Sequence, residues 1–124
     1  MPYTLTVPEG EGLFRLKLTG VLTADDLLQF GMEIAELERT RAGSRLTDLT
    51  GLTGIAIGFL ELEAYVKRNL RDVLPNDVKS ALVAATPVTI GFARMFQTLT
   101  DNPQVDVRIF PDEASARAWL QEPT

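Results

Sequence analysis

The sequence of 124 residues contains no cysteine and no histidine. Without cysteine there are no disulfides and no thiolate nucleophiles, and without either residue nearly all zinc sites are excluded. The absence of histidine also excludes Ser-His-Asp triads and the commonest general acid and base of enzymes. Carboxylates, lysine, tyrosine and hydroxyl groups remain for catalysis, and the sequence arranges them in no acid–base constellation. We therefore expect a protein that is not an enzyme and that uses no metal and no cofactor.

An excess of basic residues and long hydrophobic runs are also missing. The net charge is −5, whereas nucleic-acid binding normally needs a basic surface, so we exclude a nucleic-acid partner. The longest apolar stretches, near Ile55–Leu60 and Ala81–Ala85, are too short to form a transmembrane segment. The N-terminus has neither the basic n-region nor the apolar h-region of a secretion signal, which predicts a cytoplasmic location.

What the sequence does contain is typical of one globular domain, which we assign to residues 1–124. Hydrophobic residues make up 45% and charged residues 23% of the chain, as in ordinary soluble domains. Near the start, apolar and polar residues alternate in Tyr3–Val7 and again in Leu13–Thr19, as they do in half-buried strands. A segment rich in turn-forming residues separates the two, so we predict an antiparallel hairpin.

The rest of the chain alternates between helix and strand patterns. Thr23 and Asp26 predict a capping box at the start of a helix that Gly43 ends. Further strands are expected at Ser44–Thr50, Val78–Ala85 and Val105–Phe110, and further helices at Leu60–Val73, from Thr86-Pro87 or Thr89 up to Asn102-Pro103, and at Glu113–Gln121. The order β-β-α-β-α-β-α-β-α predicts an α/β fold: a five-stranded mixed, mostly parallel sheet with four helices, most of them on one face.

Two segments of the sequence resemble the STAS / SpoIIAA-like family. Leu46-Thr-Asp-Leu-Thr-Gly-Leu52 is similar to the family's strand that ends in Asp-Leu-Ser before its signature loop. Ala81–Leu120 resembles the uncharacterised SpoIIAA-like branch, in which a strand, a Gly-initiated helix and a closing strand–helix unit end in Ala-Trp-Leu. The resemblance covers almost the whole chain and implies a SpoIIAA-like (STAS) fold.

The best-known members of this family are anti-sigma-factor antagonists. They are switched by phosphorylation of a Ser in an Asp-Ser-Ser-Gly turn at the start of the second helix. In this chain the comparable stretch, Gly54–Gly58, contains no hydroxyl group. Thr50 and Thr53 precede the expected position and are the candidates for a switch. The resemblance thus implies a regulatory protein–protein interaction module that lacks the usual phospho-Ser.

A glycine-rich apolar stretch, Gly51–Phe59, follows the third expected strand. We predict that this stretch forms a loop. Three roles are open for it: a packed plug over the end of the sheet, a lid over an apolar pocket, or a self-association surface. In the lid, Gly51, Gly54 and Gly58 would supply backbone freedom. The uncharacterised relatives imply a small apolar or lipid-like ligand. We expect the second helix and the preceding loop to contact it through Ile55, Ile57, Phe59, Leu60, Leu62, Tyr65 and Val66.

Three functional hypotheses follow from these observations. The first is a non-enzymatic STAS-like module that binds a small apolar or lipid-like ligand near the loop and the second helix. The second is a regulatory module of the anti-sigma-factor-antagonist type that binds a protein partner. The third is an enzyme that uses carboxylates or Tyr65, which the sequence supports least. Half-bare sheet edges and a small apolar loop would also suit an isologous homodimer.

Overall fold

Five strands form one sheet in the order β1-β2-β3-β4-β5 in the computed structural model, which describes residues 3–7, 12–40, 43–69, 74 and 76–122. The β1–β2 pair is antiparallel, and the β2–β3, β3–β4 and β4–β5 pairs are parallel. This confirms the predicted mixed sheet and the predicted element order. The elements are β1 (Tyr3–Thr6), β2 (Leu13–Thr23), α1 (Ala24–Thr40), β3 (Ser44–Ala56), α2 (Phe59–Asn69), β4 (Val78–Val83), α3 (Pro87–Leu99), β5 (Val105–Phe110) and α4 (Glu113–Leu120).

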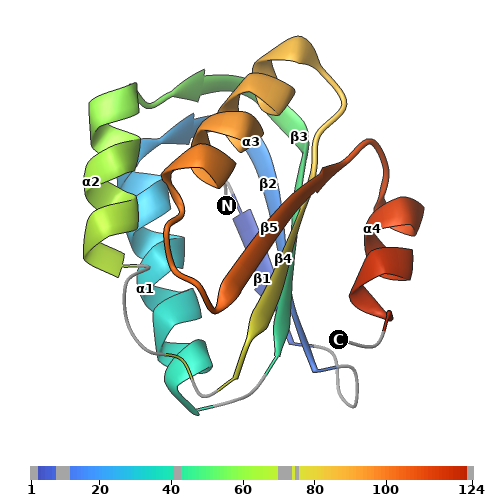
Figure 1. Cartoon of the computed structure of the whole chain (residues 1–124). Coiled ribbons are helices and arrows are strands. Elements are labelled where there is room, and N and C mark those ends of the chain that lie inside the picture. The colour runs from blue at the N-terminus through green and yellow to red at the C-terminus, as the bar shows by residue number, and fades with distance from the viewer. Residues whose placement is uncertain (1–2, 8–11, 41–42, 70–73, 75, 123–124) are drawn as a thin grey trace.

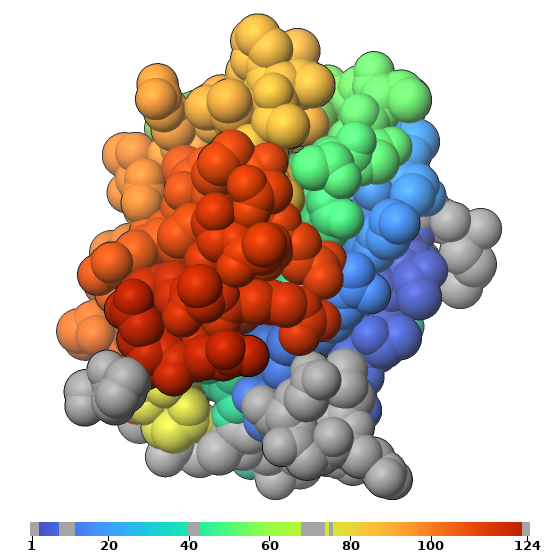
Figure 2. Space-filling view, turned by 90° about the vertical axis from the view of Figure 1, so that its right-hand side faces the viewer, coloured from blue at the N-terminus to red at the C-terminus, as the bar shows by residue number. Residues whose placement is uncertain are grey.

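The helices cover the two faces of the sheet unequally. Helices α1, α2 and α3 lie on one face, and α4 lies alone on the other (Figure 1). Seen from the α4 side, β1 and β2 remain uncovered beside it (Figure 2). Two separate apolar clusters result, a large one between the sheet and α1–α3 and a small one under α4. The small cluster contains Trp119, which is buried as a core residue and packs against Phe110.

Side-chain caps position the starts of three helices. Before α1, the Thr23 hydroxyl accepts from the Asp26 N–H while the Asp26 carboxylate accepts from the Thr23 N–H, which confirms the predicted capping box. Thr86 caps α3, so this helix opens at the first of the two positions that the sequence allowed. Asp112 caps α4 by accepting from the Ser115 N–H at 2.7 Å. These caps satisfy backbone donors that a helix leaves unpaired at its N-terminus.

The predicted apolar loop is wrong, because this stretch belongs to a strand. Strand β3 continues to Ala56, and β2 continues to Thr23 rather than ending at Thr19. The two run side by side through the pairs Gly20↔Leu52, Val21↔Gly54, Leu22↔Ile55 and Thr23↔Ala56. Neither a lid nor a plug of the expected length exists. Of the Gly51–Phe59 stretch, Ile57 and Gly58 alone lie outside a helix or strand.

Gly51 explains why a turn-forming residue occurs inside a strand. A Cβ atom at this position would lie 2.7 Å from the backbone oxygen of Leu18 on β2. The register of the β2–β3 pair shifts close by, between Lys17 and Thr19, and the two backbones approach closely there. The glycine therefore permits strand pairing rather than hinge motion, which local sequence patterns cannot distinguish.

Gly31 permits a close contact between α1 and α2. A Cβ atom at Gly31 would lie 2.5 Å from the Tyr65 Oη and 2.8 Å from its Cζ. Tyr65 is buried, so its ring cannot swing into solvent without leaving the core. The helix-weakening glycine is therefore retained where two helices must pack closely.

We predict that Gly31→Ala lowers the free energy of unfolding by about 2 kcal/mol, because the new methyl group would overpack the core. Gly91→Ala is the matched control, since Gly91 also lies within a helix but a Cβ atom there would meet no atom of another element of the described chain within 4 Å. It should raise stability by about 0.5 to 1 kcal/mol through its helix propensity. Urea unfolding measures both, and equal effects at the two positions would contradict the close contact.

Candidate functional site

A cavity of about 50 Å³ lies within the layer between α1–α3 and the sheet. Most of its lining side chains are aliphatic or aromatic and come from all three helices and from β2, β3 and β4. Four polar residues also line it, namely Arg45, Thr47, Tyr65 and Ser80. The cavity is therefore an apolar space with polar groups at its wall, a combination typical of small-molecule sites.

Arg45 carries a charge into this layer, and Glu38 neutralises it. The Arg45 Nε donates to the Glu38 Oε2 at 2.5 Å and its NH2 group donates to the Glu38 Oε1 at 3.0 Å. The two side chains are 7% and 5% exposed, so the pair is buried. A forked pair of this kind compensates both charges. Arg45 therefore contributes a neutralised polar wall rather than an unpaired cation.

Tyr65 lies between the cavity, Gly31 and this buried ion pair. Burial raises the pKa of Tyr65 to about 12, with a smaller lowering effect from Arg45 and a raising effect from Glu38. The phenol is therefore protonated at neutral pH and acts as a hydrogen-bonding group, not as a base. The enzyme hypothesis that used Tyr65 stays a prediction.

Two residues that carry hydroxyl groups line the cavity from neighbouring strands. Thr47 lies on β3 and Ser80 on β4, and both line the cavity. Ser80 is 1% exposed. A hydroxyl group both donates and accepts hydrogen bonds, so these two residues would suit a polar atom in the cavity.

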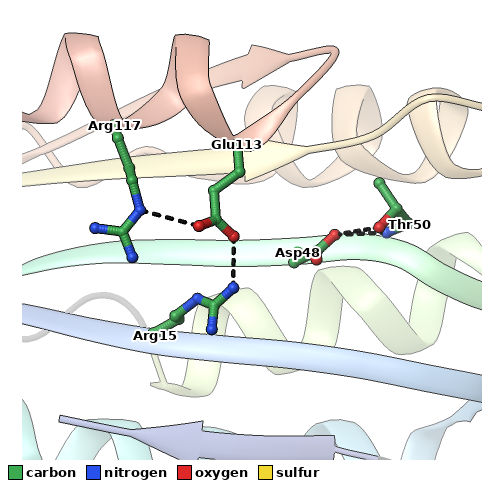
Figure 3. A network of polar contacts seen from close by, with 5 residues as sticks. All are labelled: Arg15, Asp48, Thr50, Glu113 and Arg117. Atoms are coloured by element: carbon green, nitrogen blue, oxygen red, sulfur yellow. Dashed lines mark hydrogen bonds and ion pairs between the residues drawn. The ribbon is translucent and has the colours of Figure 1, made fainter. Parts of the chain in front are cut away.

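A polar network on the opposite face of the sheet holds α4. Glu113 accepts from Arg15 at 2.6 Å and from Arg117 at 2.9 Å, and both arginines point towards it (Figure 3). These two hydrogen bonds keep the pKa of the Glu113 carboxyl below its ordinary value. All three side chains are about one-third exposed, so the network is only partly shielded from solvent.

The structure separates the predicted ligand-binding residues. Tyr65 lines the cavity, whereas Leu62, Val66 and Ile57 are buried in the core around it. Ile55 is partly buried against that core. Phe59 and Leu60, at the start of α2, are exposed. The seven residues therefore do not form one continuous ligand surface. Contact of each residue with a ligand stays a prediction.

Of the four polar residues that line the cavity, Tyr65 was predicted, whereas Arg45, Thr47 and Ser80 were missed by the sequence analysis, as was Glu38, the partner of Arg45. Glu38 lies eleven residues after Leu27 and four after Ile34, on the apolar stripe of α1, where a carboxylate needs compensation. Arg45 follows seven residues later, at the start of β3. The sequence did contain a signal, namely a carboxylate on an apolar stripe followed by a cation in the next strand. Which cation pairs with that carboxylate depends on the fold.

Two solved structures resemble the chain over nearly its whole length. An uncharacterised protein from the DUF3478 family with a SpoIIAA-like fold, from Shewanella loihica PV-4, has a TM-score of 0.66 at 16% identity, covering 95% of this chain and 93% of that one. The anti-sigma factor antagonist SpoIIAA in its unphosphorylated form has a TM-score of 0.59 at 17% identity, covering 94% and 96%. No protein-family model matches the sequence, and no curated protein matches it.

The chain has a SpoIIAA-like fold. This confirms the fold that the sequence resemblance implied. In this SpoIIAA-like fold Thr50 and Thr53 lie exposed on β3, ahead of α2. The Thr50 hydroxyl donates to the Asp48 Oδ1 at 2.6 Å (Figure 3). A switch at either threonine stays a prediction.

The SpoIIAA-like fold presents no metal centre within the residues that the structure describes, since no three of their acidic side chains lie close enough together to hold an ion. No helix in the described part of the chain has the length and apolar content that a membrane crossing requires.

We predict that the stability of the protein falls as the pH rises from 10 to 12. Tyr65 ionises at its ordinary pKa of 10 in the unfolded chain but at about 12 in the folded one, so its contribution is complete below pH 10 and is lost above it. The loss should be roughly 2 kcal/mol. Urea unfolding at several pH values measures it, and Tyr65→Phe should flatten the slope. An unchanged slope in Tyr65→Phe would contradict the burial of the phenol.

We predict that Arg45→Met destabilises the protein by about 3 kcal/mol, because it leaves the Glu38 carboxylate buried without its cation. The double variant Glu38→Met with Arg45→Met should recover much of this loss, since it removes both charges. Arg39→Met is the matched control, because Arg39 pairs with Glu36 at an exposed site. It should cost less than about 0.5 kcal/mol. Equal losses in the two single variants by urea unfolding would refute the compensation.

Proposed function

We propose that this SpoIIAA-like chain is a non-enzymatic binding module and that its ligand is a small, mostly apolar molecule held between α1–α3 and the sheet. The observation that carries the proposal is the cavity itself, an apolar space that Ser80 and Thr47 line from two neighbouring strands. The absence of histidine and cysteine and the protonated state of Tyr65 support a binding role over a catalytic one.

The polar wall indicates the chemistry of the ligand. Glu38 already neutralises Arg45, so an anionic head group would meet no free cation among the described residues that line the cavity. The hydroxyl groups of Ser80 and Thr47 both donate and accept hydrogen bonds. We therefore infer that the ligand carries one neutral hydroxyl or carbonyl group rather than a carboxylate.

The size of the cavity limits the ligand further. Its volume of about 50 Å³ is a third of the ~150 Å³ at which an apolar protein cavity binds benzene. A molecule smaller than benzene fits the cavity as it stands, and a longer one such as 1-hexanol requires a helix to move away from the sheet. Helix α2 is the candidate wall, because Ile57 and Gly58 join it to β3 outside any regular element.

A titration with 1-hexanol and hexanoate tests this function. We predict that 1-hexanol binds and shifts the amide NMR signals of residues around Ser80 and Tyr65, and that hexanoate binds at least about tenfold more weakly, because its charge would be buried without a free cation. Ala93→Leu should abolish 1-hexanol binding, since Ala93 lines the cavity and the larger side chain fills it.

Ala114→Leu is the matched control for this experiment. Ala114 is exposed on α4, on the other face of the sheet, and the same substitution there should leave 1-hexanol binding unchanged. If 1-hexanol binds equally well to the Ala93→Leu variant, or if hexanoate binds better than 1-hexanol, the proposed ligand site is wrong.

Exposed apolar side chains support a second candidate, a protein-interaction module of the anti-sigma-factor-antagonist type without the usual phospho-Ser. Phe59 is 49% and Leu60 75% exposed at the start of α2. Large apolar groups that remain in solvent are often contact residues. A homodimer and a cytoplasmic location remain predictions from the sequence.

A further inference from the structure

A groove separates the N-terminal halves of α1 and α2 on the outer surface of the helical layer. Its volume is about 340 Å³, and it is lined by Ala24, Leu27 and Leu28 from α1 and by Glu61, Ala64 and Tyr65 from α2. Both helices follow parallel strands of one sheet and lie side by side (Figure 1). The groove is thus a depression between two neighbouring helices, and it shares only Leu27 and Tyr65 with the described lining of the interior cavity.

Apolar side chains project into solvent on both sides of this groove. On α1, Leu28 is 41% and Met32 68% exposed, and their i,i+4 spacing places them on one stripe. On α2, Leu60 is 75% exposed and has the same spacing to Ala64. Two apolar ridges with a groove between them form the surface that receives an amphipathic helix in helix-in-groove recognition.

The charges that lie nearest to the groove are acidic. Residues 24–34 and 59–66 contain five carboxylates, Asp25, Asp26, Glu33, Glu61 and Glu63, and no basic residue. Two of them have partners elsewhere, because Glu33 accepts from the Tyr3 hydroxyl and Glu63 pairs with Lys67. Glu61 lines the groove directly, and Asp25 lies three residues before Leu28 on the same stripe of α1. Basic residues follow at Arg39 in the last turn of α1 and at Lys67 and Arg68 in α2, and Lys67 pairs with Glu63 at 3.7 Å. This surface therefore attracts a cationic partner and repels an anionic bilayer surface.

We propose that this acidic apolar groove binds a basic amphipathic helix of a partner protein. Apolar side chains of the partner enter between the Leu28–Met32 and Leu60–Ala64 ridges, while its Lys or Arg side chains meet Asp25 and Glu61. The proposal does not depend on the ligand of the cavity, and it specifies the partner class for the second candidate function.

A designed peptide tests this inference. The probe is an 18-residue helix of Leu and Lys with leucines at i, i+3, i+4 and i+7, titrated into the whole chain by calorimetry and by amide NMR. The peptide should bind and shift the amide NMR signals of α1 and α2. Its affinity should fall as the salt concentration is raised, because the charges at the interface are exposed. A peptide of the same pattern with Glu in place of Lys should bind at least about tenfold more weakly.

Variants locate the binding site. Leu28→Ser and Met32→Ser should each weaken binding of the Leu/Lys peptide by about tenfold, as expected for contact residues at an interface. Val88→Ser is the matched control, because Val88 is 60% exposed but lies at the start of α3 and does not line the groove. Asp25→Asn with Glu61→Gln should remove most of the salt dependence. The Gly58 N–H donates to the Glu61 Oε1 at 3.0 Å, and the amide oxygen of a glutamine at position 61 can accept the same hydrogen bond.

Each alternative gives a distinct result. Equal binding of the Leu/Glu peptide, or an equal loss in Val88→Ser, would overturn the proposal. Binding to phosphatidylglycerol vesicles that is lost in Leu28→Ser would also overturn it, because it would assign the groove to a membrane. A concentration-dependent dimer that is lost in Leu28→Ser would overturn it as well. Binding of 1-hexanol should persist in Leu28→Ser, so failure of this proposal and failure of the cavity proposal are distinguishable.

Discussion

The long parallel pairing of β2 and β3 determines where both candidate sites lie. The two strands stay paired up to Thr23 and Ala56, so α1 and α2 begin next to each other at one end of the sheet. Because both helices then run back over the same face, a groove forms between their first turns and a cavity forms beneath them. Gly51 makes the pairing possible, since any side chain there would collide with the Leu18 backbone.

Electrostatic compensation divides the molecule into a neutral interior and a charged exterior. Inside, Arg45 and Glu38 cancel each other, and Tyr65 stays protonated beside them. Outside, the first turns of α1 and α2 carry carboxylates that suit the positive ends of the helix dipoles and leave the surface acidic. A neutral ligand inside and a cationic partner outside are the chemistries that these two environments accept.

The architecture was largely predictable, because periodicity and caps are local signals. Thr23 with Asp26 and Asp112 each mark a helix start by hydrogen bonds to residues three positions away, which the sequence reveals directly. The extent of β3 was not predictable. Gly51, Gly54 and Gly58 have the local signature of a loop, and only the neighbouring β2 backbone explains a glycine inside a strand. Of the candidate site, Tyr65 was anticipated, whereas Thr47 and Ser80 gave no signal because each is a common residue in a strand.

The sequence by itself determined the class of fold, the order of the elements, the net acidic charge and the lack of histidine and cysteine chemistry, since composition and short-range patterns carry these properties. Only the tertiary structure decided which side chains meet. Glu38 and Arg45, Gly31 and Tyr65, and Thr47 and Ser80 become neighbours because strand register and helix packing place them together, and contacts between elements depend on that register rather than on any local pattern. The cavity and the groove are therefore products of packing, whereas the fold that contains them could be predicted from the chain.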